Sequence, residues 1–251
     1  MLARWTGGPC EIVLVRHGHS LGNLADAEAR EREAERLDLS DRDADVDLSD
    51  VGRDQADGVG RWLVAAEDAG RPTVVVSSPY QRAAETARRA VEKLDLELTF
   101  DERLRERDLG AFDGLTGLGI RARYPEEAER RKKLGKFYYQ PPSGESWADV
   151  VLRVRSLLDD LRHGYDDARV WMFSHQAVIM SFRYVLEGLS EEELLDIDRT
   201  TPLPNASMTV YRRSGHTWKL DRFADTCAVD DIDAEVTREA PQGGRGDDAH
   251  Q

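Results

Sequence analysis

Residues 11–23, which read E-I-V-L-V-R-H-G-H-S-L-G-N, indicate both the fold and the place where reactive groups gather. The apolar run at residues 12–15 is typical of a strand that is buried on both faces of a parallel sheet. A cation, two imidazoles, a glycine and a hydroxyl follow directly, at residues 16–20. Ligands of open α/β sheets bind beyond the carboxyl ends of the strands. We therefore expect these side chains to lie in a ligand crevice.

The same pattern recurs along the chain, because short apolar runs alternate with segments that favour helices. Strands are predicted at residues 74–76, 96–100 and 170–173, and a final strand pair at residues 207–212 and 217–223. Helices are predicted at residues 49–69, 80–94, 147–162 and 177–187. This alternation predicts an α/β fold, a three-layer α/β/α arrangement around a mostly parallel central sheet.

Two internal segments depart from the alternation. Residues 24–47 carry many charges and few large apolar side chains, which predicts a solvated helix or mobile loop over the site, with the helix at residues 25–37. Residues 106–146 are too short for a core of their own and predict a small helical cap over the carboxyl ends of the strands, with one helix near residues 120–134.

The predicted domain covers residues 11–224. An N-terminal extension, residues 1–10, precedes it, and an acidic, partly disordered tail, residues 225–251, follows it. The 251 residues include 40% apolar side chains, which is enough for a substantial core.

Net charge and cysteine content limit the classes of partner. A formal charge of −14 argues against nucleic acid or an anionic membrane, although a local cluster of arginine and histidine can still bind a small anion. Cys10 and Cys227 supply neither a disulfide framework nor a zinc pattern. No segment has the apolar core of a signal peptide or the roughly 20 apolar residues of a membrane span. We predict a cytoplasmic protein.

Polar groups at three strand ends point to a phosphoryl ligand. Arg16 and His17 follow the first strand, Ser78 and Arg82 follow the second, and His175 follows the strand at residues 170–173. Guanidinium groups bind phosphoryl oxygens bidentately, and helix N-termini add amide donors. The P-loop sequence of nucleoside triphosphatases is absent from the chain.

These residues also carry a family resemblance. The sequence R-H-G-H-S-x-x-N from Arg16 resembles the R-H-G-[EQ]-[ST]-x-x-N signature of the histidine phosphatase superfamily, which includes cofactor-dependent phosphoglycerate mutases. Four further segments follow in the family's order. They are L-S-x-x-G-x-x-Q-A from Leu48, S-S-P-x-x-R-A-x-x-T-A from Ser77, L-x-E-x-x-x-G from Leu104 and the S-H pair at Ser174.

The resemblance implies catalytic roles. His17 would attack phosphorus and form a phosphohistidine, so its other ring nitrogen needs an acceptor such as a backbone carbonyl. Glu106 would protonate the leaving alcohol and then activate water, which requires a raised pKa. His175 would act with Arg16 and Arg82 on the phosphoryl oxygens.

Asn23 could add a neutral donor to the phosphoryl group or simply cap the chain. The scheme needs no metal ion and no other cofactor, and the sequence offers no convincing set of metal ligands.

The substrate is less defined. The segment around P-x-G-E-S resembles the fructose-2,6-bisphosphatase domain, but Gln140 and Pro141 stand where that domain has cations, which argues against a bisphosphate. His19 replaces the family's Glu or Gln, and could bind substrate, titrate near neutral pH or pack. The candidates for substrate contact are His19, Ser20, Arg107, Lys136, Tyr138, Tyr139 and Gln176.

Hydrolysis of a small phosphomonoester is the favoured function. A phosphoglycerate mutase and a catalytically inactive phosphate-binding module remain as alternatives. We expect a small phosphorylated substrate as partner and leave a homodimer open.

Overall fold

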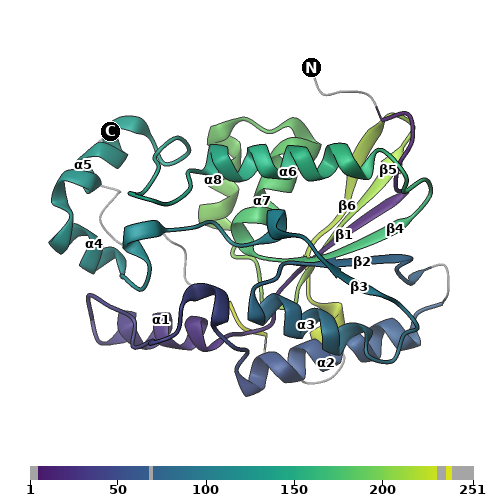
Figure 1. Cartoon of the computed structure of the whole chain (residues 1–251), viewed down its shortest axis with the longest axis horizontal. Coiled ribbons are helices and arrows are strands. Elements are labelled where there is room, and N and C mark those ends of the chain that lie inside the picture. The colour runs from purple at the N-terminus through teal and green to yellow at the C-terminus, as the bar shows by residue number, and fades with distance from the viewer. Residues whose placement is uncertain (1–4, 68–69, 231–235, 239–251) are drawn as a thin grey trace.

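A six-stranded mixed sheet forms the middle layer of the computed structural model, which describes residues 5–67, 70–230 and 236–238 (Figure 1). The strands are β1 (Glu11–Arg16), β2 (Val74–Ser77), β3 (Leu98–Phe100), β4 (Arg169–Ser174), β5 (Met208–Ser214) and β6 (Thr217–Asp225). Their order is β3-β2-β4-β1-β5-β6. The pairs among β1 to β4 are parallel, whereas β5 runs antiparallel to β1 and to β6. The predicted, mostly parallel sheet is confirmed.

Helices cover both faces of this sheet. One face carries α2 (Asp50–Ala65), α3 (Gln81–Val91) and α9 (Cys227–Asp230), and the other carries α6 (Trp147–Leu161) and α7 (Gln176–Arg183). The side chains of β1 alternate between the two layers. Ile12 and Leu14 pack with α6 and α7, and Val13 and Val15 pack with α2 and α3. This arrangement confirms the predicted three-layer α/β/α fold.

Further elements lie at the end of the molecule toward which β1 and β4 run. Figure 1 shows α1, α4 and α5 together at that end. The remaining elements are α1 (Leu21–Glu31), α4 (Gly117–Arg123), α5 (Pro125–Leu134), α8 (Glu191–Thr200), the 3-10 turns η1 (Asp43–Asp45), η3 (Glu102–Leu104) and η4 (Gly110–Phe112), and a π-helical turn, η5 (Tyr184–Gly188). None of the helices within the described ranges is both long and apolar enough to cross a membrane.

Several helix boundaries differ from the sequence-based predictions. The helix predicted near residues 120–134 is two helices, because Pro125 begins α5 and breaks the backbone hydrogen bonds of α4. The helix predicted at residues 25–37 begins earlier, after the N-cap Ser20, and ends at Glu31. The helix predicted at residues 177–187 ends as α7 at Arg183 and continues as the π-helical turn.

Segments outside the predicted domain pack onto it. In the N-terminal extension, Trp5 is buried, and its ring lies 5.2 Å from that of Trp218. In the tail, Ala228 and Val229 are buried against the α2–α3 side of the sheet. The last residues of the tail, predicted to be disordered, lie outside the described residues, and the proposed domain limits remain predictions.

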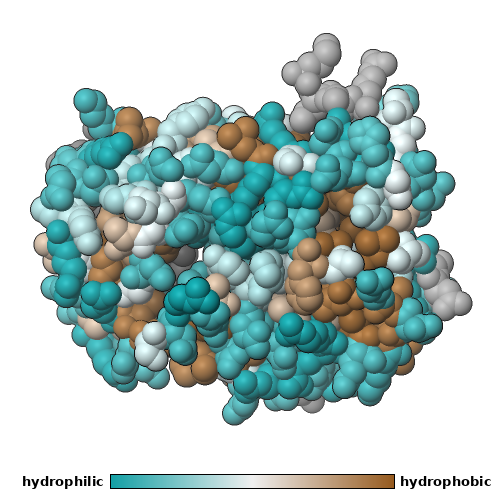
Figure 2. Space-filling model, in the orientation of Figure 1, coloured by the Kyte–Doolittle hydropathy of each residue, from teal (hydrophilic) through white to brown (hydrophobic). Residues whose placement is uncertain are grey.

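The edge strand β3 leaves apolar surface exposed. Figure 2 shows a largely hydrophilic face on which hydrophobic residues gather over β2 and β3. Phe100 of β3 is 47% exposed, and Arg88 lies over its ring at 5.5 Å. A three-residue edge strand beside a cation limits edge-to-edge pairing.

Candidate active site

The loop after β1 passes close to the first turn of α2. A Cβ atom on Gly18 would lie 2.5 Å from the carbonyl oxygen of Gly52, and a Cβ atom on Gly52 would lie 1.9 Å from that of His19. Both positions therefore require glycine. Ser49 caps α2 by accepting a hydrogen bond from the Gly52 amide at 3.1 Å. The two motifs R-H-G and L-S-x-x-G thus fit against each other.

His17 is buried at the end of β1, with 3% of its surface exposed. Its Nδ1 atom lies 2.8 Å from the carbonyl oxygen of Gly18. A carbonyl can only accept, so Nδ1 carries the proton and Nε2 keeps its lone pair. Burial, followed by the positive charges of Arg82 and Arg16, holds the pKa of His17 well below 6.5. The ring is neutral and has the tautomer expected from the sequence, with a free lone pair on Nε2 as the predicted nucleophile requires.

His175, at the end of β4, faces His17 with 5.1 Å between ring centroids. Its Nε2 atom lies 2.9 Å from Ser78 Oγ, which already accepts a hydrogen bond from the Tyr80 amide. While it accepts from the Tyr80 amide, the Ser78 hydroxyl can either donate to Nε2 or accept from it, so this contact alone leaves the tautomer of neutral His175 open. Nδ1 makes no hydrogen bond to any described residue. Burial, and then the charge of Arg82, lowers the pKa of His175 well below its usual value.

Two buried arginines accompany the histidines. Arg16 donates from Nη1 to the carbonyl oxygen of Leu203 and is 1% exposed. Arg82, on α3, is 5% exposed, and its charge contributes to the lowered pKa of both His17 and His175. The structure thus brings together groups from the three strand ends that the sequence singled out.

Arg82 also pairs with an aspartate from the charged segment. Its Nη1 lies 3.0 Å from Asp43 Oδ1, and its Nη2 lies 3.3 Å from Asp43 Oδ2. Nη1 also donates to the backbone carbonyl of Asp43 at 2.5 Å. An internal carboxylate therefore occupies both terminal nitrogens of the guanidinium.

Glu106 follows η3, and its side chain accepts a hydrogen bond from the Arg107 amide at 2.7 Å. Burial raises the pKa of the Glu106 carboxyl above 4.5, with a further rise from the charge of Asp43, whereas Arg82 acts in the opposite direction. A carboxyl group with a raised pKa is suited to donate a proton.

A clamp formed by Glu145 and Arg153 holds the loop that carries Glu106. Glu145 accepts from Arg105 Nη2 at 2.5 Å and from the Asp108 amide at 3.1 Å. Arg153 Nε donates to Glu145 at 3.1 Å, and Arg153 Nη2 donates to the Glu106 carbonyl at 3.2 Å. The P-x-G-E-S segment therefore fixes the backbone around the predicted proton donor.

Ser20 and Asn23 form the capping box of α1. Asn23 Oδ1 accepts from the Ser20 amide at 2.9 Å, and the Asn23 amide donates to Ser20 Oγ at 3.2 Å. Asn205 Nδ2 donates to Asn23 Oδ1 and to the His17 carbonyl, both at 3.2 Å. Both residues thus shape the His17 loop, and their predicted contacts to phosphate or substrate remain predictions.

His19 contacts α2. Its Nδ1 atom lies 2.8 Å from Ser49 Oγ, and its amide donates to Gln55 Oε1 at 2.8 Å. Gln55 Nε2 donates to Thr237 of the tail at 3.0 Å. Among the three roles considered for His19, these contacts with α2 support packing.

Three of the candidate substrate residues gather around Trp147 and Asp198. The guanidinium of Arg107 and the ammonium of Lys136 lie 5.6 and 5.8 Å from the centroid of the Trp147 ring. Lys136 Nζ and Gln176 Nε2 each donate to the Asp198 carboxylate at 3.0 Å.

The two candidate tyrosines bind glutamates. Tyr138 is 56% exposed and donates its hydroxyl hydrogen bond to Glu191 of α8. Tyr139 is buried and donates to Glu127 of α5 at 2.8 Å. Their predicted substrate contacts remain predictions.

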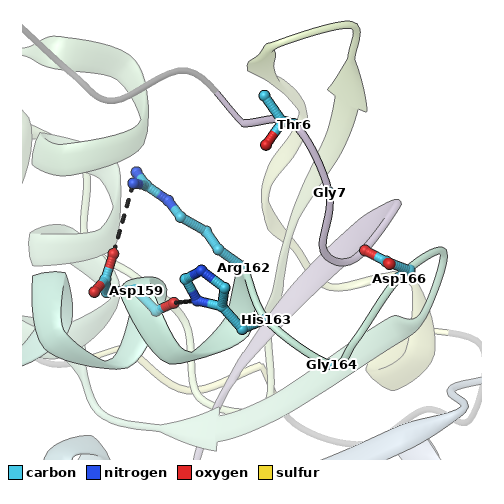
Figure 3. Close-up of a pocket in the computed structure, with 7 residues that line it drawn as sticks. All are labelled: Thr6, Gly7, Asp159, Arg162, His163, Gly164 and Asp166. Atoms are coloured by element: carbon cyan, nitrogen blue, oxygen red, sulfur yellow. Dashed lines mark hydrogen bonds and ion pairs between the residues drawn. The ribbon is translucent and has the colours of Figure 1, made fainter.

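A separate groove lies at the opposite edge of the sheet. Figure 3 shows it between the N-terminal residues Thr6 and Gly7 and the end of α6, beside Arg162 and His163. These residues precede β1 and β4, whereas His17 and His175 follow them. The groove contains none of the predicted site residues.

Sequence reasoning missed Asp43, Arg153, Asn205 and Asp198. The spacing of Ser190 and Glu193 marks the capping box that begins α8, the helix that carries Asp198, but no sequence pattern points to Asp198 itself. The other three residues are placed by tertiary contacts that no local pattern indicates.

The chain matches the family model of the histidine phosphatase superfamily (branch 1) over residues 12–226. The bifunctional protein Rv2228c of Mycobacterium tuberculosis is 34% identical over 193 residues, which cover 73% of this chain and 47% of that protein. The chain thus spans about half the length of this relative.

Two further similarities cover nearly the whole length of the matched proteins. The 2,3-bisphosphoglycerate-dependent phosphoglycerate mutase of Chelativorans sp. is 31% identical over 210 residues, 80% of this chain and 91% of the mutase. The native structure of the mycobacterial glucosyl-3-phosphoglycerate phosphatase Rv2419c aligns with a TM-score of 0.68 and 27% identity, over 86% of this chain and 98% of that chain. These findings confirm the predicted class of enzyme, a phosphatase-type hydrolase. The chain belongs to the histidine phosphatase superfamily (branch 1).

Proposed function

We propose that the enzyme hydrolyses a small phosphomonoester through a phosphohistidine on His17. The observation that carries this proposal is the neutral, buried His17 ring, whose Nδ1 proton is held by the Gly18 carbonyl at 2.8 Å and whose partner His175 lies 5.1 Å away. Such a ring directs one lone pair, that of Nε2, toward an electrophile.

In the first step, Nε2 of His17 attacks phosphorus, and the bond from phosphorus to the ester oxygen breaks. Glu106 donates its proton to the departing alcohol oxygen, so the leaving group departs neutral. Arg16, Arg82 and His175 donate hydrogen bonds to the non-bridging oxygens, whose negative charge the transition state redistributes; His175 does so from Nδ1 in the tautomer in which Ser78 donates to its Nε2. Buried donors of this kind act strongly because little water screens them.

In the second step, the Glu106 carboxylate removes a proton from a water molecule, and the resulting hydroxide attacks phosphorus. The bond between phosphorus and Nε2 breaks, phosphate leaves, and His17 regains its lone pair. Glu106 is protonated again, so both groups return to their starting states.

The leaving group is the part of the substrate that this site defines least. Three polar side chains gather around Trp147 and Asp198, namely those of Arg107, Lys136 and Gln176. They support a polar leaving group whose hydroxyl or anionic groups bind to these side chains. We propose a phosphorylated metabolite of modest size, of the kind named for the glucosyl-3-phosphoglycerate phosphatase neighbour.

A phosphoglycerate mutase is the second candidate, favoured by the Chelativorans mutase that matches over 91% of its length. A mutase must keep its phosphohistidine away from water and pass the phosphoryl group to an alcohol acceptor. Single-turnover trapping separates the two functions. A phosphatase loses the phosphoenzyme without any acceptor, whereas a mutase retains it until an acceptor is added.

The deciding experiment is a phosphomonoester panel assayed with the native enzyme, His17→Ala and His163→Ala. His163 is an exposed residue at the opposite edge of the sheet, so its variant is the matched control. We expect activity from the native enzyme and from His163→Ala, and none from His17→Ala. Equal inactivity of the native enzyme and His17→Ala on every ester, together with no phosphoenzyme in the single-turnover experiment, would leave only the inactive phosphate-binding module.

A further inference from the structure

The charged segment, residues 24–47, bridges the cap and α3. On the cap side, the Thr116 amide donates to the Glu35 carbonyl at 3.1 Å, and the Leu37 amide donates to the Gly114 carbonyl at 3.0 Å. The side chain of Glu35 pairs with Arg123 of α4 at 2.9 Å. On the other side, η1 contacts α3 through Arg82. The segment is thus tied to both sides of the proposed site.

Within this segment, Asp43 presents its carboxylate to Arg82 in the two-point geometry that a phosphoryl group would use. Both Nη atoms of Arg82 are engaged, at 3.0 and 3.3 Å. A guanidinium binds carboxylate and phosphoryl oxygens through the same fork of donors. The two anions therefore compete for one cation.

The burial of the pair indicates which partner can leave. The Arg82 side chain is 6% exposed, whereas that of Asp43 is 42% exposed. Asp43 can turn into water at little desolvation cost, but the guanidinium cannot follow it. A phosphoryl dianion bound at Arg82 with Asp43 still in place would also set like charges in contact.

We propose that Asp43 is an internal anion that occupies Arg82 until a phosphoryl group displaces it, and so sets the affinity of the site for phosphoryl ligands. The proposal rests on the proposed function of Arg82 as a phosphoryl ligand. The apparent affinity of any anion is then reduced by the fraction of molecules in which Asp43 holds Arg82. Residues 24–47 thereby acquire a function in the site that they border.

Asp45 supplies a matched control from the same turn. Its carboxylate pairs with Arg42 at 2.6 Å, and both side chains are more than half exposed. Asp43→Asn and Asp45→Asn remove the same charge from the same short helix. Only the first substitution removes a charge that contacts Arg82.

The experiment measures binding of inorganic phosphate by calorimetry to the native enzyme and both variants, together with kcat and KM on para-nitrophenyl phosphate. We expect Asp43→Asn to bind phosphate about three- to tenfold more tightly, with KM lowered by a similar factor. Phosphate affinity and KM are the readouts of the proposal, because the Asp43 charge also raises the pKa of Glu106 and its removal acts on kcat separately. Asp45→Asn should match the native enzyme.

Unchanged or weaker phosphate binding by a folded Asp43→Asn protein overturns the proposal, since Asp43 would then be a neutral neighbour or a group that positions Arg82. Asp43→Ser serves as a second variant if the asparagine protein does not fold. Arg82→Ala separates this outcome from failure of the proposed function. If Arg82→Ala binds phosphate as tightly as the native enzyme, the role of Arg82 itself is wrong.

Discussion

The Nδ1 atom of His17 lies 2.8 Å from the carbonyl oxygen of Gly18, the residue that follows it in the chain. The contact is set by the local backbone, and the close approach of Gly18 to Gly52 keeps that backbone in place. The tautomer of the proposed nucleophile is therefore fixed before any substrate binds. This gives a first prediction about the site of phosphorylation.

Phosphorylation should occur on Nε2 of His17 and not on Nδ1. Nδ1 carries a proton that the Gly18 carbonyl holds, so only Nε2 has a lone pair in the plane of the ring. Nuclear magnetic resonance of the trapped, isotopically labelled phosphoenzyme identifies the bonded nitrogen. A phosphorus coupling to Nδ1 would show that the Gly18 contact does not control the tautomer.

The pH profile of kcat/KM should be bell-shaped, with its maximum at acidic pH. His17 must be neutral to attack, and its pKa lies well below 6.5, so activity falls only when the pH drops well below that value. Glu106 must be protonated to act, and its pKa lies above 4.5, so activity falls again as rising pH removes that proton. Rates measured from about pH 4 to about pH 8 check both limbs.

Glu106→Gln is the control for the alkaline limb. The glutamine side chain has no carboxyl proton to lose, so the residual activity of this variant should not decline as the pH rises. The pH profiles of the native enzyme and of Glu106→Gln use the same substrate, so the titration of the substrate affects both profiles equally. An acid limb at or above pH 6.5 in the native enzyme would contradict the neutral, buried state of His17.

The strand ends were predictable from the sequence because β1 and β4 are buried on both faces and read as apolar runs. Parallel strands end at the same edge of a sheet, so His17 and His175 had to meet once β1 and β4 paired. The partners of Arg82 and Glu106 were not predictable. Asp43 comes from a segment without apolar periodicity, and Arg153 is one of several polar residues on the amphipathic helix α6, so only tertiary packing brings either to the site.

Removal of the Glu145 charge should destabilise the fold and slow catalysis. Glu145 and Arg153 are 14% and 9% exposed, and Glu145→Gln leaves the Arg153 and Arg105 charges without their common carboxylate. We expect a loss of about 3 kcal/mol in the free energy of unfolding. A lower kcat should accompany it, because the loop that holds Glu106 loses its clamp. Urea unfolding and steady-state kinetics measure the two effects.

Glu28→Gln is the matched control for this experiment. Glu28 pairs with Arg32 at 3.1 Å on the surface of α1, with 43% and 65% of the two side chains exposed. Its loss should cost about 0.5 kcal/mol or less. Equal effects of the two substitutions would show that the Glu145 cluster is no more than a surface pair.

The tail should contribute to catalysis through Thr237. Its hydroxyl accepts from Gln55 Nε2 and donates to Asn205 Oδ1, both at 3.0 Å. The Gln55 side chain accepts from the His19 backbone amide, and the Asn205 side chain donates to the His17 carbonyl. The Thr237 hydroxyl therefore links the two side-chain amides that hold the His17 loop.

Thr237→Val keeps the shape of the side chain and removes this hydroxyl. Gln55 and Asn205 are buried, and each loses a hydrogen bond, which should cost about 2 kcal/mol of stability in total. The kcat value should fall because Nε2 of His17 is less firmly placed for attack. Thr217→Val, which removes an exposed hydroxyl from β6, should leave kcat unchanged. A Thr237→Val enzyme with the native kcat would show that the His17 loop holds its geometry without the tail.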